Sequence, residues 1–318
     1  MLSWIKNNLQ SGLTAYITHP DCALHNVGDA HPECPERLTA IKDQLMASQI
    51  FDSLHEVEAP EATDEQITRA HPPRYLEYLE LSQPVTGTFR VDPDTAMMPY
   101  TLRAARRAAG GVVKAVEMVC EGKAPNAFCA IRPPGHHAES AKAMGFCYFN
   151  NVAIGVRHAL SHYELERAAI IDFDVHHGNG TEEIFRDDPQ VLMASIFQHP
   201  FFPYCGDQPM GANMCNIPLK AGSGSTEFRD AVVDGWLPRL REFKPQILFI
   251  SAGFDAHRED DMGMMGLTEA DYEWVTRQLV KFAKEYCDGR IVSVLEGGYD
   301  LSALGRSVAA HVKVLTDI

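Results

Sequence analysis

Short apolar runs alternate with longer segments of helical spacing along most of the chain. Six runs are rich in Ile, Val, Leu and Phe and stop abruptly; they cover residues 13–18, 127–131, 168–173, 191–197, 246–251 and 290–295. Near-continuous apolar runs of this length are typical of strands that are buried on both faces, which is the pattern of a parallel sheet.

Apolar residues recur three and four positions apart in residues 100–120, and residues 226–243 and 268–286 behave similarly. This spacing predicts three helices, and Thr268 is the predicted N-cap of the last one, with Asp271 three residues further on. The proline-containing stretch 83–99 predicts a long surface loop.

Strands that alternate with helices imply right-handed β-α-β crossovers and a three-layer α/β fold. The sequence has no internal repeat, no low-complexity tract and no linker long enough to separate two domains. We therefore expect a single domain over residues 1–318.

The composition narrows the class of protein. The chain has 318 residues with 45% hydrophobic and 22% charged residues, which is ordinary for a globular protein, and its net charge is −15. An acidic chain is a poor candidate for binding nucleic-acid phosphates, although a basic peptide remains a suitable partner. No stretch approaches the roughly 20 apolar residues that span a bilayer, so no membrane association is expected.

Residues 1–12 have no continuous apolar core, so we expect no signal peptide. The eight cysteines are scattered and form no C-x-x-C pair. Disulfide frameworks are characteristic of short secreted chains, and a zinc-thiolate site needs more closely spaced cysteines. The simplest interpretation is a cytoplasmic protein with reduced thiols.

Polar residues that could carry chemistry follow four of the apolar runs. In α/β folds the ligand crevice lies beyond the carboxyl ends of the strands, so these segments should open onto one crevice. The four segments are Arg132-Pro133-Pro134-Gly135-His136-His137, Asp172-Phe173-Asp174-Val175-His176-His177-Gly178, Ala252-Gly253-Phe254-Asp255 and Glu296-Gly297-Gly298-Tyr299.

Asp172, Asp174 and His176 are spaced two residues apart, which places their side chains on one face of an extended strand. A solvated strand end with a capping Asp would explain this segment alone equally well. Asp255, at the end of another run, favours a metal site over a solvated strand end. Two carboxylates and one imidazole are a suitable three-ligand set for Zn²⁺, with one position left open for water.

The adjacent His136 and His137 follow a rigid Pro-Pro-Gly turn opposite this candidate metal site. An imidazole beside a metal can take up or return a proton. Tyr299 follows two glycines and could donate its hydroxyl to a developing oxyanion, although an ordinary half-buried tyrosine would also fit. Phe146, Phe201 and Phe202 are more typical of core residues than of a pocket wall when they are considered alone.

These motifs resemble the zinc-dependent histone deacetylase family. The resemblance extends from about residue 16 to near the C-terminus, and its motifs occur in the family's order. His31-Pro32-Glu33 and Pro35-Glu36-Arg37-Leu38 resemble the class II branch and its bacterial amidohydrolase relatives. Further matching segments are Arg132–Glu139, Gly145–Asn150, Asp172–Thr181, Ser251–Ala256 and Glu296–Tyr299. The resemblance implies the arginase/deacetylase fold, with a largely parallel sheet of eight strands between helices.

The resemblance implies roles for individual residues. Asp174, His176 and Asp255 would bind one catalytic Zn²⁺ ion. His137 would act as general base and acid with His136 as its electrostatic partner, and Tyr299 would polarise the acyl carbonyl.

Relatives also hold potassium beside the zinc site. The implied residues for one K⁺ ion are Asp172 with the backbone of Asp174 and His176, then Ser195 and Ile196. A possible second and more peripheral K⁺ ion would lie near Phe185, Asp188 and Val191.

The implied acyl-lysine tunnel is walled by Gly145, Phe146 and Phe202, with Cys147 in its floor and Met262 at its mouth. In the resemblance Asp172 supports His136, whereas Asn179 supports His137 at a place where class I members have an Asp. Because an Asp favours a protonated imidazole and an Asn does not, His137 should be neutral and His136 more basic.

The expected activity is hydrolysis of an N-ε-acyl-lysine amide, most simply acetyl-lysine, by metal-activated water. An acetylpolyamine or other small-molecule amide is the alternative substrate. The polyamine-selective relative carries Glu seven residues after the second zinc Asp, where this chain has Met262, but Asp260 and Asp261 are close enough to keep the alternative open. A catalytically silent module that binds acyl-lysine would lack a zinc ligand or Tyr299, and neither is missing.

Overall fold

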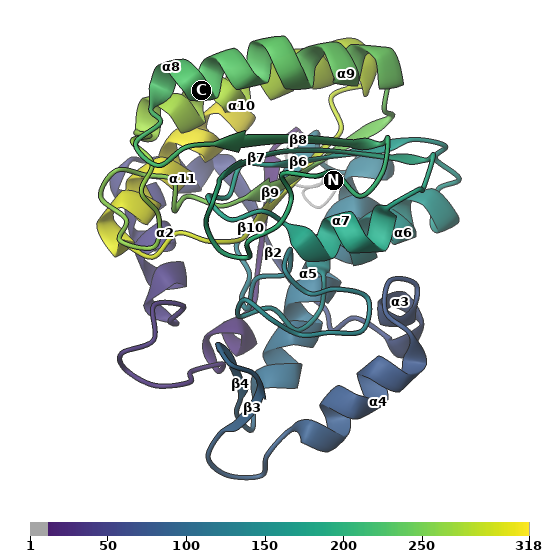
Figure 1. The fold of residues 1–318 in the computed structure, drawn as a ribbon, viewed down its shortest axis with the longest axis vertical. Coiled ribbons are helices and arrows are strands. Elements are labelled where there is room, and N and C mark those ends of the chain that lie inside the picture. Colours follow the sequence, from purple (N-terminus) through teal and green to yellow (C-terminus); the bar gives the residue numbers. More distant parts are fainter. Residues whose placement is uncertain (1–11, 318) are drawn as a thin grey trace, which may run out of the picture.

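An eight-stranded, entirely parallel sheet forms the centre of the computed structural model, which describes residues 12–317 (Figure 1). Its strand order is β2-β1-β5-β10-β9-β6-β7-β8. In chain order these strands are β1 (Thr14–Thr18), β2 (Leu54–Glu58), β5 (Asn126–Cys129), β6 (Ala168–Asp172), β7 (Val191–Gln198), β8 (Met214–Leu219), β9 (Ile247–Ala252) and β10 (Ile291–Leu295).

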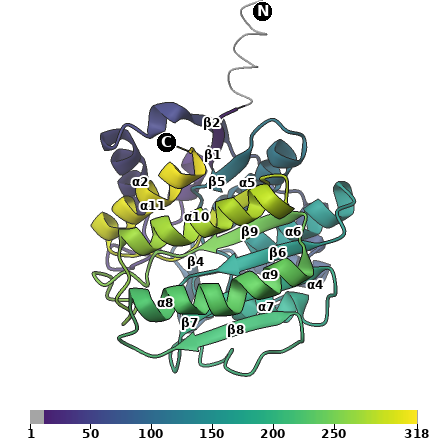
Figure 2. The ribbon, with the colours of Figure 1, turned by 90° about the horizontal axis from the view of Figure 1, so that it is seen from above.

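Helices cover both faces of the sheet, so the fold has three layers (Figures 1 and 2). One face carries α2 (Glu36–Ala47), α8 (Ser225–Asp230), α9 (Leu237–Phe243), α10 (Glu269–Tyr286) and α11 (Leu301–Leu315). The other face carries α5 (Thr101–Cys120), α6 (Asn151–His162) and α7 (Asn179–Phe185). The expected fold class, a single α/β domain with a parallel eight-stranded sheet between helices, is confirmed.

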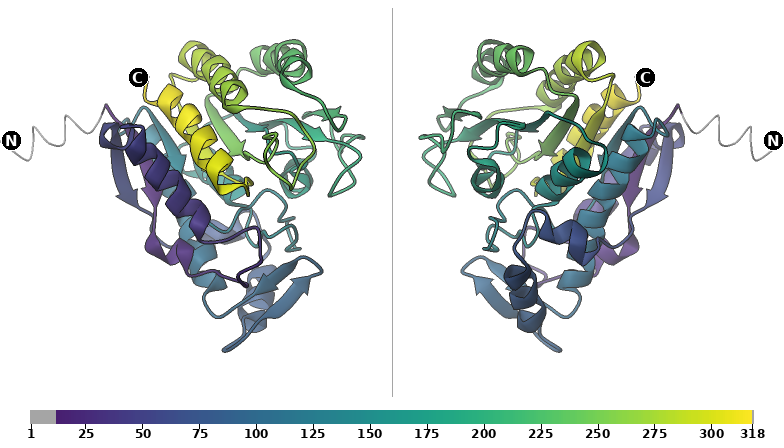
Figure 3. Two further views of the ribbon diagram at one scale, coloured as in Figure 1. Left: turned by 90° about the vertical axis from the view of Figure 1, so that its left-hand side faces the viewer. Right: turned by 90° about the vertical axis from the view of Figure 1, so that its right-hand side faces the viewer.

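A smaller layer projects beyond α5, away from the sheet (Figure 3). It contains α3 (Asp64–Thr68), α4 (Pro73–Ser82) and a hairpin of β3 (Phe89–Asp92) and β4 (Thr95–Met97). The expectation of a loop over residues 83–99 was therefore wrong in part. The alternation of Phe89 and Val91 with polar residues is a strand pattern, but it is too short to stand out beside the buried strands.

The six apolar runs all contain strands, and the helix predicted over residues 100–120 is α5. Thr268 and Asp271 form a capping box at the start of α10, where Asp271 accepts a hydrogen bond from the Thr268 amide at 3.0 Å. The segment predicted as a helix over residues 226–243 is helical throughout, but its hydrogen-bond pattern changes in the middle. A π-helical turn, Ala231–Trp236, separates α8 from α9, and a proline lies in the first turn of α9. Proline cannot donate an intrahelical hydrogen bond, so a local change of hydrogen-bond pattern is expected there.

Several expectations concern residues that lie outside the described part of the chain. The expected absence of a signal peptide concerns residues 1–11, which lie outside it. The expectation of one domain over residues 1–318 includes residues 1–11 and residue 318, which also lie outside it. Within residues 12–317, no helix combines the length and apolar character that a bilayer span requires. All eight cysteines are free thiols.

Candidate active site

The four polar segments predicted to share a crevice follow strands that are neighbours in the sheet. The strands β5, β10, β9 and β6 are consecutive in the strand order, and their carboxyl ends lie at one edge because the sheet is parallel. The loops after them bring together His136 and His137, Tyr299, Asp255, and the pair Asp174 and His176.

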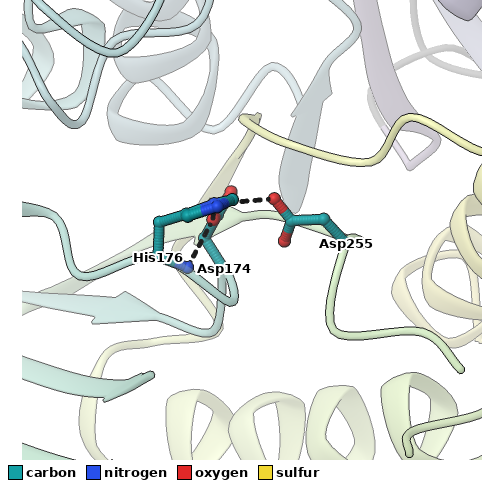
Figure 4. A group of neighbouring side chains, drawn as sticks. All are labelled: Asp174, His176 and Asp255. Atoms are coloured by element: carbon teal, nitrogen blue, oxygen red, sulfur yellow. Dashed lines mark hydrogen bonds and ion pairs between the residues drawn. The ribbon is translucent and has the colours of Figure 1, made fainter. Parts of the chain in front are cut away.

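Asp174, His176 and Asp255 form a buried cluster whose ligand atoms all lie within 4.8 Å of one another. Nδ1 of His176 lies 3.0 Å from Oδ1 of Asp174 and 3.1 Å from Oδ2 of Asp255 (Figure 4). Backbone amides hold both carboxylates in place. Gly297 donates to Asp174 at 2.8 Å, and Val175 donates to Asp255 at 2.8 Å. One nitrogen and two carboxylate donors in a buried site suit a divalent cation such as Zn²⁺.

The electrostatics of the cluster also indicate a cation. Burial and the neighbouring Asp174 carboxylate raise the pKa of Asp255 to about 7. Burial alone would lower the pKa of His176, but hydrogen bonds to the two carboxylates raise it to about 10. His176 and Asp255 thus retain protons that a bound metal ion would displace, which is the usual link between metal binding and protonation, whereas His136 and His176 lower the pKa of Asp174.

His136 and His137 have different partners. Nδ1 of His136 lies 3.0 Å from Oδ2 of Asp172, and Nδ1 of His137 lies 2.8 Å from Oδ1 of Asn179. Burial alone would lower the pKa of His136, but Asp172 and other carboxylates raise it to about 10. Burial, His136 and His176 lower the pKa of His137 well below 6.5. The difference in basicity follows the direction expected from the Asp and Asn partners.

Two further carboxylates support these loops. Glu296 is fully buried and accepts the backbone amides of Gly135 at 2.7 Å and His136 at 3.1 Å. Asp260 accepts the backbone amide of Tyr299 at 2.6 Å. Each fixes a catalytic loop through its main chain, a function that the motifs alone did not reveal.

The side chain of Tyr299 lies beside the cluster of Asp174, His176 and Asp255. The guanidinium of Arg37 stacks over its ring at 5.1 Å and donates to the Gly298 carbonyl at 2.7 Å. Burial, together with Asp255 and Asp174, raises the pKa of Tyr299 well above 10.0. The hydroxyl is therefore protonated at neutral pH and can donate a hydrogen bond.

A pocket of about 340 Å³ leads to the cluster. The residues that line it include the predicted Gly145, Phe146, Phe202, Met262, His137, His176 and Tyr299. Cys147 is fully buried and is not among them. The lining also includes Phe201, for which a core position was favoured, and Asp261, which the sequence analysis considered beside Met262. Sequence reasoning missed two lining residues, Asp94 and Tyr204.

The residues that the resemblance implied for the first K⁺ ion lie beside the cluster of Asp174, His176 and Asp255. Asp172 and Ser195 are register partners on β6 and β7, Ile196 follows Ser195, and all three are buried. Oδ1 of Asp172 accepts the amide of Asp174 at 3.1 Å. The residues implied for the second K⁺ ion have another arrangement. The carbonyl oxygens of Phe185, Asp188 and Val191 all lie within hydrogen-bond distance of the side-chain nitrogen of Asn213.

Comparison with known proteins identifies the family. The model of the histone deacetylase domain family matches residues 31–315. The chain belongs to the histone deacetylase family. A probable deacetylase of Archaeoglobus fulgidus is 38% identical over 91% of this chain and 82% of its own length. The histone deacetylase-like amidohydrolase of Pseudomonas aeruginosa is 36% identical over 85% of this chain and 72% of its own length.

Two further matches are a polyamine deacetylase and a solved domain structure. The mouse polyamine deacetylase HDAC10 is 35% identical over 95% of this chain, which spans 48% of that protein. The crystal structure of the HDA15 HD domain matches with a TM-score of 0.91 and 32% identity, covering 96% of this chain and 89% of that one. The chain therefore has the fold of a deacetylase domain and belongs among deacetylases and amidohydrolases.

Proposed function

We propose that this protein is a zinc-dependent hydrolase that removes acyl groups, most simply acetyl, from N-ε-acyl-lysine. The observation that carries this proposal is that one pocket is lined by His176 of the Asp174–His176–Asp255 cluster, by the neutral His137 and by the protonated Tyr299. A linear side chain that enters the pocket presents its amide to all of these groups.

The three ligand residues would hold Zn²⁺, which supplies Lewis acidity for polarising the amide carbonyl and acidifying a water molecule. His137 is the general base because its lowered pKa leaves it neutral at pH 7. It then returns the proton to the departing amine. Tyr299 donates its hydroxyl hydrogen to the oxygen that becomes negative in the transition state. His136, hydrogen-bonded to Asp172, supplies positive charge beside His137.

One K⁺ ion would be held by Asp172 and Ser195 with main-chain oxygens of Asp174, His176 and Ile196. Potassium sites of this kind use carbonyl oxygens in place of the hydration shell. Such an ion would compensate the Asp172 carboxylate, whose pKa burial raises.

The test combines metal analysis with turnover of an acetyl-lysine peptide. We expect about one zinc per chain, loss of activity on chelation and recovery when zinc is returned. Asp255→Ala should lose bound zinc and activity together. Tyr299→Phe should keep its zinc and lose about 100-fold or more in kcat, as for removal of one oxyanion donor.

Tyr272→Phe is the matched control for the tyrosine variant, since Tyr272 is buried and its hydroxyl has no hydrogen-bond partner among the described residues. Its kcat should match that of the wild type. A metal-free protein that hydrolyses the peptide, or one that binds zinc and hydrolyses no acyl amide, would refute the proposed function.

Acetylpolyamine hydrolysis is the second candidate, and one observation favours it. Asp261 is exposed and lines the pocket beside Met262, so a carboxylate can face a cationic substrate at the mouth. Asp260 is turned inward and cannot do this, because its carboxylate accepts three backbone amides.

A substrate panel separates the two candidates. If the peptide is the substrate class, kcat/KM for the acetyl-lysine peptide should exceed that for acetylspermidine or acetylputrescine. If acetylpolyamines are preferred, Asp261→Asn should lower kcat/KM for them by several-fold, as for loss of one exposed charge pair. Asp52→Asn removes the same charge from an exposed position at the opposite end of the sheet and is the control.

A further inference from the structure

Three main-chain carbonyl oxygens converge on one side-chain nitrogen between α7 and the start of β8. Nδ2 of Asn213 donates to the carbonyl oxygens of Phe185 at 2.8 Å, Val191 at 2.9 Å and Asp188 at 3.1 Å. All three distances are ordinary for N–H···O hydrogen bonds, and because the amide has two hydrogens for three acceptors, one hydrogen is shared between two carbonyl oxygens. Oδ1 of Asn213 is buried and has no hydrogen-bond partner among the described residues, so the amide is oriented by these three carbonyls alone.

Converging carbonyl oxygens are the donor set that binds a monovalent cation. The same three residues are those for which the family resemblance implied a second K⁺ ion. The geometry does not fit that ion, because the amide nitrogen already lies at hydrogen-bond distance from every one of the three oxygens. A cation bound by the three carbonyl oxygens would occupy the position of this nitrogen, so the two cannot be present together.

The charges around the three carbonyls are already paired. Nη1 of Arg157 pairs with the Asp188 carboxylate at 2.6 Å, and its guanidinium stacks over the Phe185 ring at 4.7 Å. The Asp188 carboxylate is compensated by Arg157, so it does not require a further cation to balance its charge.

We propose that the Asn213 side-chain amide replaces the second cation and makes this part of the fold independent of monovalent ions. The substitution has a structural consequence near the active site. Phe185 ends α7, and Asn179, the partner of His137, begins it. The amide of Asn213 therefore anchors the helix that orients the general base, without the aid of an ion.

Rubidium, an anomalous scatterer that resembles K⁺, tests the proposal directly. Crystals of the wild type and of Asn213→Ala are grown in RbCl, and anomalous density is examined at the three carbonyls. We expect none in the wild type and one Rb⁺ ion in the variant. Rb⁺ in the wild type, with the Asn213 side chain turned away, would overturn the proposal.

Thermal unfolding gives a second measurement that does not need crystals. At constant ionic strength, the Tm of Asn213→Ala should rise by about 4 °C more than that of the wild type between 1 and 100 mM K⁺, if K⁺ binds in the millimolar range. Asn216→Ala, three residues further along the chain in β8, is the matched control, because Asn216 donates to Glu182 and Gly206 rather than to converging carbonyls. Its dependence on K⁺ should equal that of the wild type.

A folded Asn213→Ala variant that gains neither Rb⁺ nor K⁺-dependent stability would also refute the proposal. Both measurements are independent of turnover. Their failure is therefore distinct from failure of the proposed hydrolase activity.

Discussion

Glu33 is the buried charge whose removal should destabilise the fold most clearly. Its carboxylate is fully buried and accepts hydrogen bonds from two buried arginines. Nη1 of Arg37 lies 3.0 Å from Oε1, Nη2 of Arg132 lies 2.7 Å from Oε2, and Nε of Arg132 also contacts Oε1. Glu33→Gln keeps the shape of the side chain but removes the charge between the two guanidinium groups.

Two independent arguments give the same magnitude for the stability that Glu33→Gln should lose. Burial alone would raise the pKa of Glu33, but Arg132 and Arg37 lower it from 4.5 to about 2. That difference corresponds to about 3 kcal/mol of stability at neutral pH. Removing one partner of a buried ion pair costs about 3–5 kcal/mol in measured cases. We therefore expect Glu33→Gln to lower the free energy of unfolding by about 3 kcal/mol.

Urea unfolding of the wild type and Glu33→Gln at pH 7 and pH 3.5 measures the effect and its sign. A carboxylate with a depressed pKa in the folded state stabilises the fold above its unfolded pKa, near 4.5, and loses this contribution as the pH falls toward 2. The difference in the free energy of unfolding between the wild type and Glu33→Gln should therefore shrink to about 2 kcal/mol at pH 3.5. Glu65→Gln, which breaks an exposed pair with Arg69, should change stability by less than about 0.5 kcal/mol. A difference for Glu33→Gln below about 1 kcal/mol at pH 7, or one that grows in acid, would refute the reasoning.

Two predictions concern the site itself. Asn179→Asp places a carboxylate against His137 and should raise the pKa of that base, so the acid limb of the kcat/KM profile should move to higher pH by about one unit or more; an unchanged limb contradicts this assignment. Gly297→Ala would place a Cβ atom 2.1 Å from Oδ2 of Asp255, and zinc affinity should fall by at least about 10-fold in a competition with a chelator. Gly266→Ala has no neighbour closer than 3.6 Å, and the same competition should give the affinity of the wild type.

The central strands could be predicted from the sequence because they are buried on both faces and have continuous apolar runs. The edge strands β2 and β8 were missed for the same reason, since only some of their residues are buried and their sequences are mixed. The hairpin of β3 and β4 was missed because it contains only short, partly exposed strands. Apolar continuity thus locates the centre of a parallel sheet better than its margins.

The candidate site was predictable where a residue's chemical type is itself informative. Asp174, His176 and Asp255 are metal-ligand types at strand ends, so their convergence followed from sheet topology. Asp94 was not predicted because an isolated acidic residue between two strands carries no positional signal. Asp260 and Asp261 were both considered near the mouth, and only the folded pocket shows that Asp261 lines its wall.

The buried carboxylates around the site differ in what compensates their charge, and this difference predicts how each tolerates substitution. Glu33 is compensated by guanidinium groups, Asp172 by an imidazole, and Glu296 by backbone amides with the Ser251 hydroxyl. A neutral amide such as Gln can still accept the hydrogen bonds of backbone amides, so Glu296→Gln preserves what holds the histidine loop. The same change at Glu33 leaves two buried cations facing each other. The cost of neutralising a buried acid here depends on the charge of its partner, more than on the depth of its burial.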